Sequence, residues 1–217
     1  MKRKITCYCD NVFEIDTPEE IDLDANGEYL EEIQSGTFLN FTCTACGKKH
    51  KPEYSLSVLW PSRKLRFEVF TEQERGDFYR RKKAPDEKSP LKLETIIGYP
   101  ELAERLAVIQ AGFEPAAIEA IKYFLHVKAE EQYPDDELDI WYYADGSTAE
   151  TSEAGAFLQF HIHGIRADEV AVMKVPFALY EKTLNDFRKT PKSETFTNLR
   201  VRTYLSVKNT MRPEELK

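Results

Sequence analysis

The sequence predicts an α+β protein made of two packed units, and three observations support this fold class. Short aromatic and β-branched segments follow one another through the first 70 residues. Longer segments with helical spacing of apolar residues begin near residue 100 and are followed by further strand-like segments. With 217 residues, 41% of them hydrophobic, the chain is long enough to bury a sizeable core.

Short strands dominate the first unit. Aromatic, β-branched or alternating apolar residues predict strands over residues 12–15, 37–41, 54–60 and 65–69. Between them, Tyr29, Leu30 and Ile33 have helical spacing and predict a short helix over residues 28–34 that ends at Gly36. The first unit is therefore expected to be mostly β-structure.

The second unit is expected to mix helices and strands. Leu102, Leu106 and Ile109 share one helical face, and Gly112 ends that helix. The same reasoning predicts helices over residues 115–132 and 177–188, strands over 139–143, 156–164, 169–175 and 199–207, and a turn at Asp145-Gly146.

Charge divides the chain into three parts. Residues 1–72 carry a net charge of −4, residues 73–92 carry +3, and residues 93–217 carry −7. The middle part contains Arg80-Arg81-Lys82-Lys83 together with two prolines, a composition typical of a solvated connection. We therefore expect a β unit over 1–72, a charged linker over 73–92 and an α+β unit over 93–217.

Hydropathy and charge restrict the function classes. No stretch approaches the roughly 20 apolar residues of a transmembrane helix, and polar residues after Cys7 interrupt any signal peptide, so a cytoplasmic protein without a membrane partner is expected. The net charge of −8 argues against a nucleic-acid partner, although the four cations of residues 80–83 could bind phosphate.

Four cysteines form the chemically sharpest signal. Cys43-Thr44-Ala45-Cys46-Gly47 has the form of a zinc knuckle, and Cys7-Tyr8-Cys9 supplies a second close pair. Together they predict a zinc-ribbon-like unit whose four thiolates, Cys7, Cys9, Cys43 and Cys46, close the coordination sphere of a structural zinc ion. The alternatives are ordinary thiols, one redox pair, or replacement of a cysteine ligand by His50.

The residues around the cysteines resemble a known family. The segments Ile5-Thr6-Cys7, Phe13-Glu14 and residues 36–48 resemble the bacterial and archaeal CpXC family, which is presumed to bind zinc and is functionally uncharacterised. The likeness continues through residues 98–105 and 117–122. The family's first pair is Cys-Pro-x-Cys, and the residue missing from Cys7-Tyr8-Cys9 leaves a site of three thiolates or a fold without metal as alternatives. Thr44 stands where the family has proline, but the spacing of the second pair is intact. The resemblance implies no catalytic residue.

Three other groups are candidate sites. Asp22, Asp24, Asn26 and Gly27 match the opening of an EF-hand loop, but Ile33 stands at the closing ligand position, so a polar loop is expected. His161 and His163 lie two apart in a predicted strand, and alternation with apolar neighbours predicts that they face away from the core without a metal or catalytic role. His126 is expected to be structural.

The sequence favours a binding or scaffolding role with an unknown protein partner over an enzyme. A metal-dependent or other enzyme with a cleft between the two units is the first alternative. A nucleic-acid-binding zinc ribbon is the second.

Overall fold

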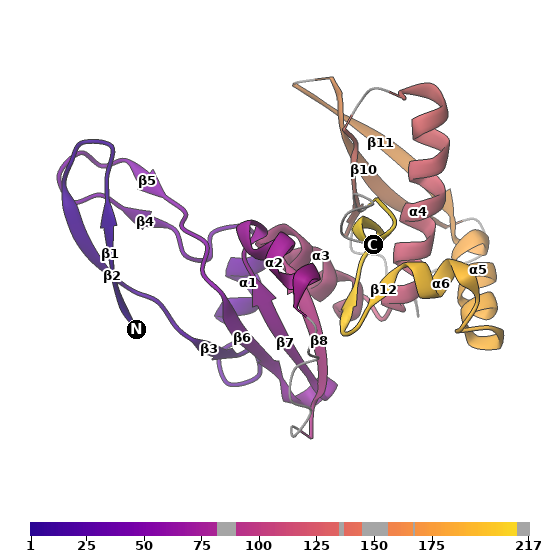
Figure 1. The fold of residues 1–217 in the computed structure, drawn as a ribbon, viewed down its shortest axis with the longest axis horizontal. Coiled ribbons are helices and arrows are strands. Elements are labelled where there is room, and N and C mark those ends of the chain that lie inside the picture. Colours follow the sequence, from indigo (N-terminus) through magenta and orange to yellow (C-terminus); the bar gives the residue numbers. More distant parts are fainter. Residues whose placement is uncertain (82–89, 135–136, 145–155, 167, 212–217) are drawn as a thin grey trace. The chain divides into compact units, whose positions relative to one another are not determined.

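The computed structural model describes residues 1–81, 90–134, 137–144, 156–166 and 168–211. It confirms the α+β class, because helices and strands occur in both of two compact units, Met1–Ala103 and Glu104–Lys217 (Figure 1). The expected turn at Asp145 and Gly146 and the cations Lys82 and Lys83 lie outside the described residues.

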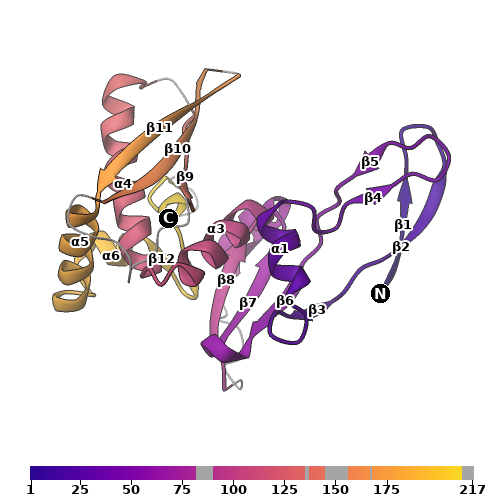
Figure 2. The same ribbon diagram turned by 180° about the vertical axis from the view of Figure 1, so that it is seen from behind.

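Unit 1 contains two small antiparallel hairpins, which β3 (Glu20–Asp22) and α1 (Glu28–Gln34) separate in the chain. They are β1 (Lys2–Thr6) with β2 (Val12–Asp16), and β4 (Phe41–Thr42) with β5 (Lys49–His50). Both views show the hairpins side by side (Figures 1 and 2). The last pairs, Thr6 with Val12 and Thr42 with Lys49, leave two loops, residues 7–11 and 43–48, that contain all four cysteines.

Four further strands of unit 1 form a sheet in the order β3-β6-β7-β8. Their bounds are Glu20–Asp22, Leu56–Trp60, Leu65–Phe70 and Lys92–Ile97. The strands β6 and β7 form an antiparallel hairpin joined by η1 (Pro61–Arg63), whereas β3 runs parallel to β6 and β8 runs parallel to β7. Every second residue of β6 and β7 is buried, as the alternation in the sequence predicted.

Two segments of unit 1 test the local predictions. The helix α1 (Glu28–Gln34) is confirmed. The strand predicted over residues 37–41 is wrong, because residues 38–39 form a turn and only Phe41 starts β4. The adjacent residues Phe38 and Leu39 are both buried, and Leu39 has a φ of 58°, which a regular strand does not allow.

Part of the segment expected as a charged linker has secondary structure. It contains η2 (Glu72–Glu74) and α2 (Arg75–Arg80), and the capping box of Thr71 and Glu74 starts this turn. Phe78 is buried in α2 and packs against Phe70 at a ring distance of 6.0 Å. The strand β8 then pairs with β7, which places it in unit 1.

Unit 2 packs helices against an antiparallel sheet of order β11-β10-β9. The elements are α3 (Tyr99–Gln110, which crosses the unit boundary), α4 (Pro115–Gln132), β9 (Asp139–Tyr143), β10 (Phe157–Arg166), β11 (Glu169–Pro176), α5 (Phe177–Lys189), α6 (Glu194–Asn198), β12 (Arg200–Val201), β13 (Tyr204–Leu205) and η3 (Val207–Asn209). Ile118, Ile121 and Leu125 of α4 share a core with Phe160 and Ile162 of β10.

The predicted elements of unit 2 are largely confirmed. The helices over 115–132 and 177–188 and the strands over 139–143, 156–164 and 169–175 match α4, α5, β9, β10 and β11. The strand predicted over 199–207 is instead the short β12-β13 hairpin followed by η3. Among the described helices, none is both long and apolar enough to cross a membrane.

A buried ionic cluster lies inside unit 2. It consists of Glu104, Arg105, Glu119 and Lys122, each at most 8% exposed. The Lys122 Nζ donates to Glu104 Oε2 at 2.6 Å and lies 3.5 Å from Glu119 Oε1, while Arg105 lies 3.5 Å from Glu119. Both carboxylates also accept backbone N–H groups, Glu104 from Tyr142 and Glu119 from Val207. The cluster therefore ties α3 and α4 to β9 and η3.

Candidate metal centre

The two cysteine loops have related backbone geometry. In the second loop, the Gly47 N–H donates to the Cys43 carbonyl oxygen at 3.0 Å and Gly47 has a φ of 72°. In the first loop, the Asp10 N–H donates to the Cys7 carbonyl oxygen at 2.9 Å and Asp10 has a φ of 63°. In each loop, the residue directly after the second cysteine has the left-handed backbone conformation that lets the chain turn back. The first loop has one residue fewer between its cysteines than the second.

All four cysteine sulfurs converge. The Sγ atoms of Cys7, Cys9, Cys43 and Cys46 lie within 4.8 Å of one another, and none of the four forms a disulfide. The Cys7 and Cys46 sulfurs are 3.5 Å apart, and the Cys9 and Cys43 sulfurs are 3.8 Å apart. Sulfurs at about 2.3 Å from a tetrahedral metal ion are about 3.8 Å from one another. The cluster therefore fits one tetrahedral ion, and the shortened pair still brings Cys9 to the site.

The thiols of this cluster differ in acidity. The backbone N–H groups of Cys46 and Ala45, with the Asn11 amide, lower the pKa of Cys43 to about 6 against the effect of burial. The Cys9 N–H also lowers the pKa of Cys7, but burial and the neighbouring thiols raise it to about 12. A metal ion must therefore displace protons from part of the cluster, so its affinity depends on pH.

Two polar residues that the sequence did not single out as neighbours contact the sulfurs. The Asn11 Nδ2 donates to Cys43 Sγ at 3.5 Å. The Nε2 of His50, which the sequence offers only as a replacement ligand, lies 3.1 Å from Cys7 Sγ. The His50 ring stacks on Tyr8 at 5.7 Å and meets the edge of Phe13 at 5.8 Å, which fixes its orientation. These contacts depend on hairpin register and not on a spacing in the sequence.

The other candidate residues lie outside the cysteine cluster. Among the described residues, the four cysteines are the group of potential ligands close enough together to hold a metal ion. His163 is exposed and His161 is half-buried, with its ring stacked on Tyr143 at 4.3 Å. Asp22 Oδ1 accepts the N–H groups of Asp24 and Ala25, as expected of a polar loop.

Unit 2 also contains a pocket of about 450 Å³ lined by His126 and Glu130 of α4 and by residues near the C-terminal end of the described chain. Burial lowers the pKa of His126, because desolvation disfavours the charged imidazolium. The structural role expected for His126 agrees with its position beside the core residue Leu125.

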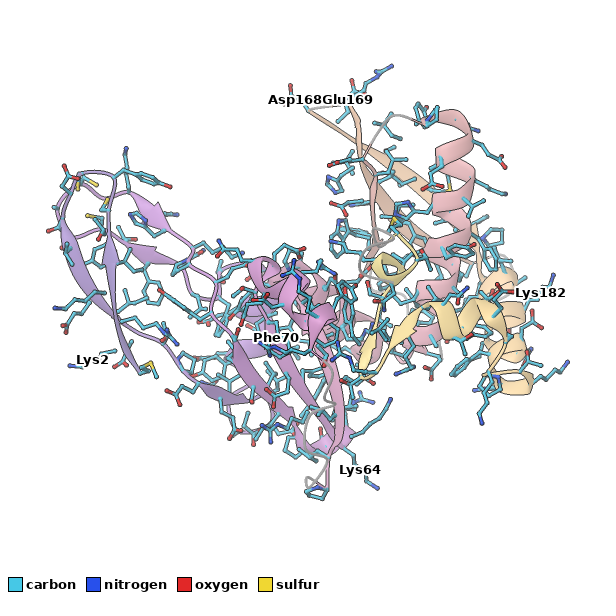
Figure 3. All side chains as sticks on the ribbon, in the orientation of Figure 1. Lys2, Lys64, Phe70, Asp168, Glu169 and Lys182 are labelled. Carbon is cyan, nitrogen blue, oxygen red and sulfur yellow. The ribbon has the colours of Figure 1, made fainter. Side chains whose placement is uncertain are left out.

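Paired cysteines presented from two adjacent hairpin loops form a cluster that could hold a metal ion. Sulfur atoms, yellow in Figure 3, gather at the loop ends of these hairpins. The chain belongs to the family described as "CpXC protein". The model of this family matches residues 5–122, more than half of the chain.

A relative from Treponema pallidum (strain Nichols), described as an uncharacterized protein, is 28% identical over 95% of this chain and 97% of its own length. The similarity therefore extends beyond the cysteine loops into unit 2. No solved structure matches the chain.

Proposed function

We propose that Cys7, Cys9, Cys43 and Cys46 bind one zinc ion whose role is structural. The observation that carries this proposal is the convergence of four sulfurs within 4.8 Å of one another, with the two closest contacts, 3.5 and 3.8 Å, near the edge length of a tetrahedral thiolate site. Four soft thiolates favour zinc or iron over calcium and magnesium. With four protein ligands the coordination sphere is closed, so no position is left for a substrate or an activated water.

The ion's role follows from the short hairpins that carry the ligands. The strands β4 and β5 pair through only two residues each, and a hairpin of this size is not stable alone in water. Each cysteine pair comes from a different hairpin, so one ion crosslinks them. Zinc binding free energy therefore contributes directly to the folding of this part of unit 1.

Spectroscopy of a substituted metal tests this proposal. We expect chelator-stripped protein to bind one cobalt(II) ion per chain, with the intense thiolate-to-metal charge-transfer absorption of a tetrahedral sulfur site. Zinc should displace the cobalt and remove this absorption. Weak absorption, or binding that persists in a variant with all four cysteines replaced by serine, contradicts the four-thiolate site.

A protein-interaction role is the second part of the proposal. Tyr8, the residue between the first two cysteines, is 87% exposed, and its ring contacts His50 and the Lys48 ammonium. The loop therefore exposes an aromatic side chain on a backbone that metal binding makes rigid. Exposed aromatic side chains of this kind often anchor protein interfaces. The net charge of −8 favours a protein partner over nucleic acid.

Co-purification from the native host tests the interaction role. Tyr8→Ala should reduce recovery of a specific partner at least about tenfold while leaving zinc content unchanged. Tyr133→Ala, which removes another exposed tyrosine at the end of α4, is the matched control and should recover the partner as the wild type does. Equal recovery with both variants would contradict a role for this loop.

A further inference from the structure

The strand β11 is an edge of the unit 2 sheet. Of the strands that the structure describes, it pairs only with β10. It is eight residues long, and its side chains Val170, Val172 and Met173 are 46%, 54% and 37% exposed. A long apolar edge strand has unpaired backbone N–H and C=O groups that can pair with another strand, and soluble proteins seldom leave such an edge uncovered.

The hydrogen-bond phase of the β10-β11 ladder shows which backbone groups face outward. The Phe177 N–H donates to the Ala156 carbonyl oxygen at 2.8 Å, one step beyond the pair of Phe157 and Pro176. Bonded and non-bonded pairs alternate in an antiparallel ladder, so Val175, Met173 and Ala171 direct their backbone groups toward β10. Val172 and Lys174 consequently direct theirs to the free edge, and continued alternation does the same for Val170.

The same alternate residues carry a self-complementary pattern. Val170, Val172 and Lys174 of β11 share the face opposite the core, and all three are exposed. Asp168, in the turn that precedes β11, follows at the same two-residue spacing and is also exposed. Figure 3 labels Asp168 and Glu169 at the tip of the β10-β11 hairpin. In an antiparallel pair with two-fold symmetry about Ala171, Asp168 of one copy lies opposite Lys174 of the other, and Val170 lies opposite Val172.

We propose that the partner of this edge is a second copy of the same chain, and that two β11 strands pair antiparallel about Ala171. Val170 and Val172 of the two copies then exchange backbone hydrogen bonds and bury their side chains against each other. The two Asp168 and Lys174 pairs fix the register, because a shift along the strand loses both charge contacts. The three-stranded sheet of each copy continues into a six-stranded sheet. This proposal uses unit 2 alone and does not depend on the metal site.

Charge reversal with rescue tests the register. We expect the wild type to sediment at twice its 25.2 kDa chain mass. Lys174→Glu places like charges opposite each other at both ends and should weaken the dimer at least about tenfold. Adding Asp168→Lys restores opposite charges and should restore the dimer. Lys182→Glu, the same change at an exposed site of α5, is the matched control and should leave the dimer unchanged.

Crosslinking tests the position of the two-fold axis. Ala171 lies opposite its own copy in a non-hydrogen-bonded pair, where Cα atoms about 4.5 Å apart allow a disulfide. Ala171→Cys should therefore form a crosslinked dimer under mild oxidation, whereas Val170→Cys, which lies opposite Val172, should not exceed the background of the parent protein. A monomeric wild type overturns the proposal. A dimer that is insensitive to Lys174→Glu, or that crosslinks equally through both positions, also overturns it.

Discussion

The buried ionic cluster makes the stability of unit 2 depend on one lysine. The Lys122 side chain is 3% exposed, and its ammonium lies 2.6 Å from Glu104 and 3.5 Å from Glu119. Lys122→Met keeps the length of the side chain and removes its charge. Glu119 then retains Arg105 and a backbone N–H, whereas Glu104 keeps only the backbone N–H of Tyr142 among the contacts described above. The cost of the substitution therefore comes mainly from Glu104.

The size of this cost follows from the geometry. At 2.6 Å and an effective dielectric constant of about 20, the attraction between the two charges is about 6 kcal/mol. Part of this attraction offsets the desolvation of the ions, and removal of one partner from a buried pair costs about 3–5 kcal/mol. For a unit of this size, the melting temperature should fall by about 10–20 °C.

Thermal unfolding at pH 8, where Glu104 is mostly ionised, measures the effect. Lys128→Met changes an exposed lysine of the same helix and should shift the free energy of unfolding by less than about 0.5 kcal/mol. Adding Glu104→Gln to Lys122→Met removes the unpaired charge and should recover at least about half of the loss. A Lys122→Met protein that melts within about 2 °C of the wild type would contradict a stabilising role of the Lys122 charge.

Three further predictions concern titration, the strand histidines and charge. Burial raises the pKa of Glu104 from 4.5 to about 7 despite the nearby Lys122. Between these two pKa values the folded protein holds a proton that the unfolded chain has lost. The contribution of Glu104 to the free energy of unfolding therefore falls as the pH rises from 4.5 to about 7. Urea titrations at several pH values should show a smaller decrease for Glu104→Gln, and an unchanged slope would argue against the raised pKa. Replacing His161 and His163 with glutamine should leave metal content unchanged and cost about 1 kcal/mol, from the lost stacking on Tyr143; a metal equivalent that disappears in this variant would revive the enzyme hypothesis. Binding of DNA or RNA near physiological salt should be weaker than micromolar, because Asp77 pairs with Arg80 at 3.1 Å and Arg81 lies over the Phe70 ring; tight, salt-dependent binding in a titration would contradict this.

The cysteine cluster could be predicted because its signal is local. The spacing of Cys43 and Cys46 and the glycine after them define a turn that aims two sulfurs at one point. The role of the shortened first loop was less evident, because Asp10 takes the left-handed conformation that the second loop gives to glycine. The contacts of His50 depend on how the two hairpins lie together, which no spacing encodes.

The ionic cluster could not be predicted because its partners are distant in the chain. Glu119 and Lys122 have the spacing of an ordinary exposed pair on α4. Their partners come from distant segments, since the Val207 N–H, 88 residues away, donates to Glu119, and the Tyr142 N–H donates to Glu104, the partner of Lys122. The turn at Phe38 and Leu39 was missed for a similar reason, since Phe38 packs on Tyr29 and Tyr99 and not in a sheet.

The metal content of the purified protein is the direct test of the four-thiolate zinc site. Elemental analysis of protein purified without chelators should find one zinc ion per chain. Cys43→Ser and Cys9→Ser should each lose most of this zinc, while His50→Gln, which contacts Cys7 without being one of the four ligands, should retain it. Substoichiometric zinc in the wild type, iron in its place, or a Cys9→Ser protein that keeps its full complement of zinc would contradict a structural zinc site of four thiolates.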